Sequence, residues 1–334
     1  MNIEQGAAGE AANHLALPLA TLALFAAFAC WTLLAAVGVQ LKHIWQFSET
    51  TFAAVLVLPL LAGGFFAPVM GVLAESFGGR RIIMAGHIGL AAVLVALLSA
   101  ESALALLLAG LGFGLAGGVF SAGLRYITDH SAGEGNAMRI GVYLAGMSGA
   151  GFSYLIVPVV GSAYDWRVAP IAYLCLILFA LLLMATMTPA ELPYPPGRIR
   201  THATGSVTRT PWSLCGFYGA LFGSIVALAL WLPDYLRGHY HLGVLGATSF
   251  ALVFLVPAML AQTLGALLYR PGTPHRLQRP ALWVLLGCLF FLSYPSTTMT
   301  VGYPRCASSI AVATAGGLSW IVGGSRCGIR GAFG

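Results

Sequence analysis

The stretch TFAAVLVLPLLAGGFFAPVMGVLAESFGGRR, residues 51–81, decides the fold. Its first part, Thr51 to Leu73, carries no charged residue and is long enough to cross a hydrocarbon core, which takes roughly 20 residues of α-helix. A glutamate, two glycines and two arginines follow directly. Because a chain in lipid must satisfy its own backbone hydrogen bonds, this run predicts a membrane-spanning helix rather than a strand.

The same pattern recurs along the chain, and nine apolar runs of spanning length are separated by polar breaks. This repetition predicts an all-α transmembrane fold. The runs are Leu17–Leu41, Thr51–Leu73, Ile82–Ala100, Ala103–Ile127, Ile140–Ala163, Val168–Met187, Trp212–Leu232, Gly243–Tyr269 and Ala281–Val301.

Composition excludes a soluble fold. Of the 334 residues, 59% are hydrophobic and 8% are charged, whereas a soluble domain is about 25% charged. The six cysteines have no paired spacing, so we interpret them as packing residues and expect no metal site and no cofactor. His239 and His241 lie together near Asp234; a metal or pH-sensing site and an ordinary solvated loop are both compatible with them, and the loop is favoured.

The position of the basic residues predicts the topology, because cytoplasmic loops carry an excess of Lys and Arg. With a cytoplasmic N-terminus, only Lys42, Arg167 and Arg237 fall on the outer face. Ten arginines fall in cytoplasmic breaks: Arg80, Arg81, Arg125, Arg139, Arg198, Arg200, Arg209, Arg270, Arg276 and Arg279. The net charge of +6 therefore reflects the orientation of the chain in the membrane. We expect an inner-membrane protein in a lipid bilayer, with no nucleic-acid partner.

Five segments are expected. The first, residues 1–16, is a cytoplasmic tail and not a cleavable signal, because no basic cluster precedes the first run. Residues 17–188 form an N-terminal six-helix bundle. A proline-rich cytoplasmic linker, residues 189–211, separates this bundle from a partial C-terminal bundle, residues 212–301. The atypical tail, residues 302–334, has the composition of an out-of-frame or truncated terminus.

The polar end of the opening stretch predicts a gating loop formed by Gly71, Glu75, Gly78, Arg80 and Arg81. A glycine lets helices approach closely, a glutamate can pair with a basic group or a helix terminus, and arginines can cap helix carbonyls. The alternative is that the arginine pair only sets topology. That alternative does not account for the spacing of the glycines and the glutamate.

This motif resembles the loop signature of the major facilitator superfamily, whose plan is also two helical bundles joined by a cytoplasmic linker. Within that superfamily the chain resembles the nitrate/nitrite porter branch, in the form of a member truncated at the C-terminus. The stretches that carry the resemblance are 28–31, 37–41, 47–48, 58–63, 77–81, 135–137, 157–158, 166–170, 218–224, 231–235 and 291–295.

The resemblance implies a substrate site in which two arginines, one from each bundle, hold a planar anion. Here the corresponding positions are Ala67 and Gln262, so both guanidinium groups are missing. Tyr218 matches a substrate-facing tyrosine of the branch and is also compatible with a packing role. Gln262 can donate hydrogen bonds to an anion or to a neutral polar solute, or can bond to a neighbouring helix.

The resemblance implies a secondary transporter that moves a small-molecule substrate, nitrate/nitrite or a related small anion, by alternating access. Two alternatives stay open: a non-transporting membrane protein of the same fold, either a truncated remnant or an accessory partner, and a carrier of a neutral or other polar solute. No nucleophile occurs with a base and an orienting partner, so we expect no enzymatic activity.

Overall fold

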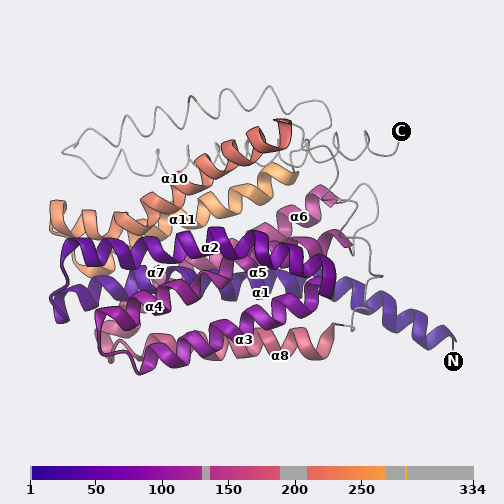
Figure 1. Cartoon of the computed structure of the whole chain (residues 1–334), viewed down its shortest axis with the longest axis horizontal. Helices are drawn as coiled ribbons and strands as arrows, with labels where there is room; N and C mark the ends of the chain where they lie inside the picture. Colours follow the sequence, from indigo (N-terminus) through magenta and orange to yellow (C-terminus); the bar gives the residue numbers. More distant parts are fainter. Residues whose placement is uncertain (1, 130–135, 189–208, 268–282, 284–334) are drawn as a thin grey trace.

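A computed structural model describes residues 2–129, 136–188, 209–267 and 283. These residues form helices and no strand, as the apolar runs predict (Figure 1). The helices are α1 (Asn2–Ile44), α2 (Glu49–Phe77), α3 (Gly79–Leu98), α4 (Ala103–Phe113), α5 (Leu115–Asp129), α6 (Asn136–Ala145), the 3₁₀ turn η1 (Gly146–Ser148), α7 (Gly149–Ala163), α8 (Val168–Met187), α10 (Arg209–Tyr240) and α11 (Val244–Leu267).

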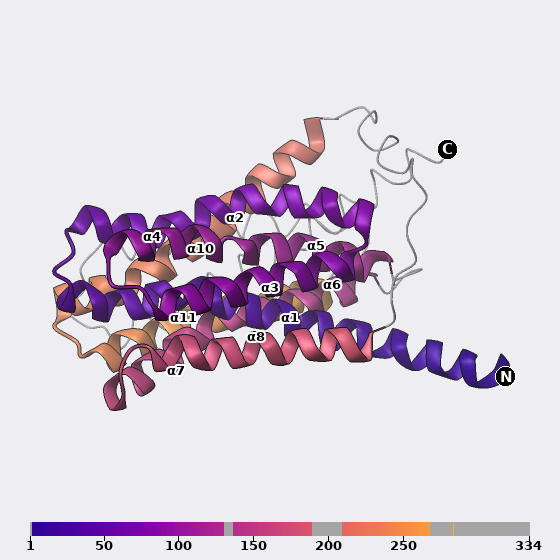
Figure 2. The same ribbon diagram turned by 60° about the horizontal axis from the view of Figure 1, so that its bottom comes forward.

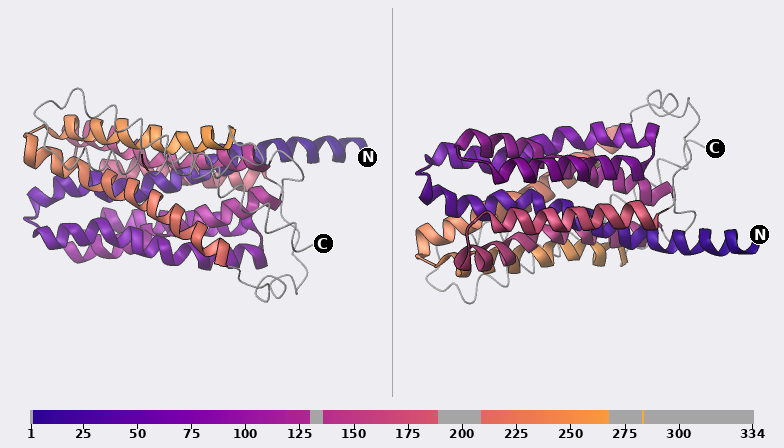
Figure 3. Two further views of the ribbon diagram at one scale, coloured as in Figure 1. Left: turned by 90° about the horizontal axis from the view of Figure 1, so that it is seen from above. Right: turned by 90° about the horizontal axis from the view of Figure 1, so that it is seen from below.

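Seven stretches of the described chain are long and apolar enough to cross a membrane, and they correspond to the first six predicted runs and the eighth. The seventh predicted run lies inside α10. The ninth run lies outside the described residues apart from Trp283, and so do the tail 302–334 and nearly all of the linker 189–211. At the other end, α1 begins at Asn2, and its first turns project beyond the remaining helices in both views of Figure 3.

Helix α1 forms the centre of the first helical set, which comprises α1 to α8. Small residues on several of its faces, including Ala20, Ala26, Ala29 and Ala36, are at most 2% exposed. Such residues allow neighbouring helix backbones to come close, and α1 contacts α2, α5, α7 and α8. In Figure 2, α3 and α8 run side by side on the outside of this set.

Two of the predicted helices are interrupted. The run 103–127 divides into α4 and α5 at Gly114, and the run 140–163 divides into α6, η1 and α7. Close packing accompanies the first break: a Cβ at Gly114 would overlap Ala62, and one at Gly117 would lie 2.6 Å from the Gly63 carbonyl oxygen. Close packing also accompanies the second break, where Gly146 lies against Thr21 of α1.

The second helical set, α10 and α11, packs on one side of the first set (Figure 1). Helix α11 lies against α6 and α7, where the Thr263 hydroxyl donates to the Gly141 carbonyl at 2.7 Å. Helix α10 receives a hydrogen bond from Tyr154 of α7 at the Ala229 carbonyl, at 2.8 Å. We call the end with the α1–α2 and α10–α11 turns the Lys42 end, and the end with the α2–α3 turn the Arg80 end.

Candidate functional site

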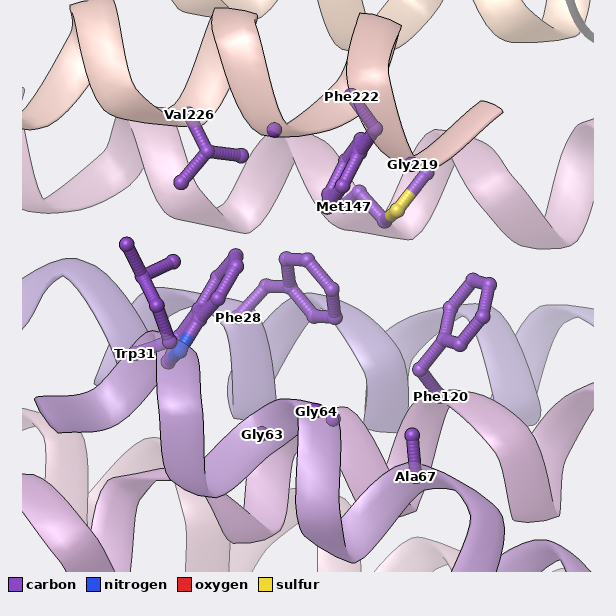
Figure 4. A pocket seen from close by; sticks show the side chains of 13 residues that line it. Phe28, Trp31, Gly63, Gly64, Ala67, Phe120, Met147, Gly219, Phe222 and Val226 are labelled. Carbon is purple, nitrogen blue, oxygen red and sulfur yellow. The ribbon is translucent and has the colours of Figure 1, made fainter. Parts of the chain in front are cut away.

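A cavity of about 620 Å³ lies between the two helical sets (Figure 4). This volume is within the range of small-molecule pockets. Helices α1, α2 and α5 and the turn η1 form its wall on one side, and α10 forms the other. The lining residues are Phe28, Trp31, Leu60, Gly63, Gly64, Ala67, Gly117, Phe120, Met147, Gly219, Phe222, Gly223 and Val226.

Trp31 links the two sides of the cavity. Its indole N–H donates to the Pro59 carbonyl at 3.1 Å, which fixes α1 against α2. Its ring meets the edge of Phe28 with centroids 5.1 Å apart and lies parallel to Phe222 of α10, with centroids 6.4 Å apart. Since the only polar hydrogen of Trp31 is already bonded, this part of the wall offers apolar and aromatic surface.

The structure places one of the three predicted substrate residues in this wall. Ala67 is half-buried, lines the cavity and points into it in Figure 4. Among the described side chains of the wall, none carries a charge. Tyr218 and Gln262 lie on α10 and α11, but their side chains are outside the described part of the chain. The wall of α2 therefore provides a methyl group where the resemblance implies a guanidinium group.

The five predicted gating residues lie along the last turns of α2 and the first turn of α3, and a single residue takes the place of the predicted loop. Only Gly78 lies between α2 and α3, with φ of 93°, a conformation that favours glycine. A Cβ at Gly79 would lie 2.7 Å from Tyr126 of α5, whereas one at Gly71 would meet Ser121 at 3.6 Å, an ordinary contact. Within the predicted gating motif, the closest approach between helices is therefore at Gly79, a residue that was not predicted to be part of the gate.

Arg80 caps the end of α8. Its Nη2 donates to the Ala185 carbonyl at 2.8 Å, and its Nε donates to the Thr188 hydroxyl at 2.6 Å. The last carbonyls of a helix lack intrahelical partners and carry partial negative charge, so a cation is favourable there. Glu75 is half-buried and forms no ion pair with any described residue, and Arg81 is exposed.

Replacing Arg80 by alanine is expected to lower the free energy of unfolding by about 1 kcal/mol, because the end of α8 loses its cap. Thermal unfolding of the purified protein in detergent measures this change. Arg81→Ala is the matched control, since it removes the same charge from the next residue, which is exposed, and should change stability much less. Equal effects of the two substitutions would show that the charge matters and the cap does not.

At the Lys42 end, three charged side chains meet. The Lys42 ammonium of α1 lies 2.9 Å from Glu49 of α2 and 3.1 Å from Asp234 of α10. It also lies 4.8 Å from the centre of the Phe52 ring. The sequence predicts Lys42 as a charge on the outer face and places Asp234 near two histidines and within the matching stretch 231–235, but it does not predict that the two residues pair. No local pattern could have joined residues so far apart in the chain.

A family model described as "Major Facilitator Superfamily" matches residues 19–328. The chain belongs to this superfamily. This confirms the resemblance, and with the spanning helices it makes the chain a multi-pass membrane protein.

Three curated relatives are similar over most of the chain. The "Nitrite extrusion protein" of Bacillus subtilis is 26% identical over 266 residues, which is 79% of this chain and 67% of the relative. The "Probable nitrate/nitrite antiporter NarK1" of Thermus thermophilus is 28% identical, with coverage of 75% and 60%. The "Probable nitrate transporter NarT" of Staphylococcus carnosus is 27% identical, with coverage of 76% and 66%. The chain thus spans about two thirds of the length of these relatives.

Solved structures support the fold. The human organic anion transporter MFSD10 superposes with a TM-score of 0.68 at 16% identity, covering 93% of this chain and 86% of that one. A bacterial homolog of the human lysosomal transporter Spinster gives a TM-score of 0.67 at 18% identity, covering 92% and 73%. At these identities the likeness concerns the fold alone.

Proposed function

We propose that this chain is a secondary transporter that moves a small solute across the membrane by alternating access. The observation that carries this proposal is the cavity, whose walls come from both helical sets, with Trp31 and Phe222 facing each other across it. A site shared by two bundles can be exposed to either side of the membrane when the bundles rock, without large changes inside either one. Residues 17–188 would form one moving bundle, and α10 and α11 would belong to the other.

Nitrate/nitrite or a related small anion is the substrate class we propose, supported by the three relatives named above. A neutral polar solute is the second candidate. Two observations favour it: Ala67 stands in place of an arginine, and the described side chains of the wall carry no charge. An anion in a dry site needs positive charges or hydrogen-bond donors. The donors for an anion would have to come from side chains such as those of Tyr218 and Gln262.

The proposed setting is the inner membrane, with the N-terminus and the Arg80 end on the cytoplasmic side, and no enzymatic activity is proposed. The excess of arginine at the Arg80 end supports this orientation. The cavity residues support transport rather than catalysis, because the described part of the wall contains no side chain that can act as a nucleophile, acid or base.

Proteoliposomes containing the 334-residue chain are expected to take up nitrate or nitrite faster than protein-free liposomes. Gly64→Trp should abolish this uptake, because Gly64 lines the cavity and a Cβ there meets no atom within 4 Å, so a large side chain can enter the open space. Gly64→Ala is the matched control and should retain uptake.

Three other outcomes are informative. Uptake of a neutral solute without nitrate or nitrite uptake would support the proposed transport and overturn the proposed anionic substrate. Uptake only by a chimera that adds the remaining third of a relative would overturn transport by this chain. Nitrate uptake that persists in Gly64→Trp would show that the cavity is not the path.

A further inference from the structure

The charged cluster at the Lys42 end joins the two helical sets. Lys42 and Glu49 belong to α1 and α2 of the first set, and Asp234 belongs to α10 of the second. Lys42 contacts both oxygens of Asp234, at 3.1 and 3.3 Å, and one oxygen of Glu49, at 2.9 Å. One ammonium group is therefore shared between a carboxylate of its own set and a carboxylate of the other.

The two carboxylates differ in exposure. The Glu49 side chain is 78% exposed, the Asp234 side chain 23% and the Lys42 side chain 14%. Water screens an exposed pair strongly and a partly buried pair much less. The pair with Asp234 therefore contributes more to holding its two helices together than the pair with Glu49.

Lys42 would keep two favourable contacts if α10 moved away. Glu49 would still pair with its ammonium, and the Phe52 ring, 4.8 Å away, belongs to the same set and would move with it. Separation of the sets at this end would thus leave Lys42 partnered and transfer Asp234 to water. Breaking the contact costs less than isolating a buried charge, which suits a contact that forms and breaks repeatedly.

We propose that the Lys42–Asp234 pair is a latch that holds the Lys42 end of the cavity closed, with Glu49 as the partner that keeps Lys42 when the latch is open. The latch rests on the proposed alternating access. It assigns a conformational role to Asp234 and Lys42 and a different role to Glu49, so the three residues have distinguishable effects.

Distances between spin labels test this assignment without any transport measurement. Labels at Ile44→Cys and Leu245→Cys, both exposed positions at the Lys42 end, report the separation of the two sets in the full chain. The six native cysteines are replaced beforehand. Asp234→Asn and Lys42→Gln are each expected to increase the population with the longer distance about fivefold, which corresponds to about 1 kcal/mol.

Three variants serve as controls. Glu49→Gln removes a carboxylate from the same lysine and should leave the closed population unchanged or larger. Asp234→Glu keeps the charge and should stay close to the parent. The double variant Lys42→Gln with Asp234→Asn should open the end no further than either single one, because both remove the same interaction.

The latch is overturned if Asp234→Asn leaves the distances unchanged, or if Glu49→Gln opens the end as far as Asp234→Asn. Gel filtration checks that each variant is folded, and the Asp234→Glu variant separates loss of charge from loss of packing. If the chain shows no uptake but its spin-label distances respond as expected, the latch is supported and the transporter proposal is overturned. The failures of the two proposals are therefore distinguishable.

Discussion

Gly149→Ala is expected to lower the free energy of unfolding by about 3 kcal/mol, at the upper end of the usual cost of overpacking a core. A Cβ at this position would overlap the Phe25 carbonyl of α1, and its next neighbour, the Phe25 Cα, is 2.9 Å away. These are backbone atoms, so no side-chain rotation relieves the overlap. Alanine favours helix over glycine by about 1 kcal/mol, which is too little to compensate.

Matched controls are available in the same molecule. Gly64 and Gly219 also lie on helices, but a Cβ at either meets no atom within 4 Å. Gly64→Ala and Gly219→Ala should therefore leave the melting temperature in detergent unchanged or slightly higher. Gly149→Ala with an unchanged melting temperature would contradict the close α1–α7 contact.

Polar contacts at the same helix pair explain why α1 and α7 cannot simply move apart. Thr32 of α1 donates to the Ala150 carbonyl at 2.7 Å, and Ser153 of α7 donates to the Ala29 carbonyl at 2.8 Å. Tyr173 of α8 donates to Ser153 at 2.9 Å. These buried hydrogen bonds require backbone proximity, and separating the helices to admit a Cβ would lengthen them.

The helices could be predicted from the sequence because their cause is local. A run such as 168–187 is apolar throughout, and lipid leaves it no backbone partner other than itself. The approach of α5 to the backbone of α2 at Gly114 and Gly117 depends on two helices and has no such local cause. The interruptions of the fourth and fifth predicted helices were not predicted; each coincides with a close approach to a helix that is distant in sequence.

The candidate site could be predicted only in part. Ala67 was located through the resemblance, and its place in the cavity wall follows from the fold. Trp31 lies within a stretch that carries the resemblance, but its contacts with Phe28, Pro59 and Phe222 depend on the packing of three helices. The Lys42–Asp234 pair could not be predicted for the same reason. Both charged residues are visible in the sequence, but their contact depends on how α10 packs on α1.

Ala67→Arg is expected to tighten nitrate binding at least about tenfold, and Ala67→Arg with Gln262→Arg more strongly. Ala67 points into the cavity, so an arginine there can bring its guanidinium group into the open space. A planar fork of N–H donors matches a planar oxyanion, and such charge-assisted hydrogen bonds are about twice as strong as neutral ones. Calorimetry on the purified protein with nitrate gives the affinity directly.

Ala67→Gln is the control for this substitution, because it adds a polar side chain without a charge. If nitrate binding depends on the missing guanidinium groups, glutamine at position 67 should improve it much less than arginine. Tight nitrate binding by the parent chain, with no gain from either arginine, would contradict this reasoning. The anion would then be held by groups outside the described wall, and Ala67 would be a spacer that sets the width of the cavity.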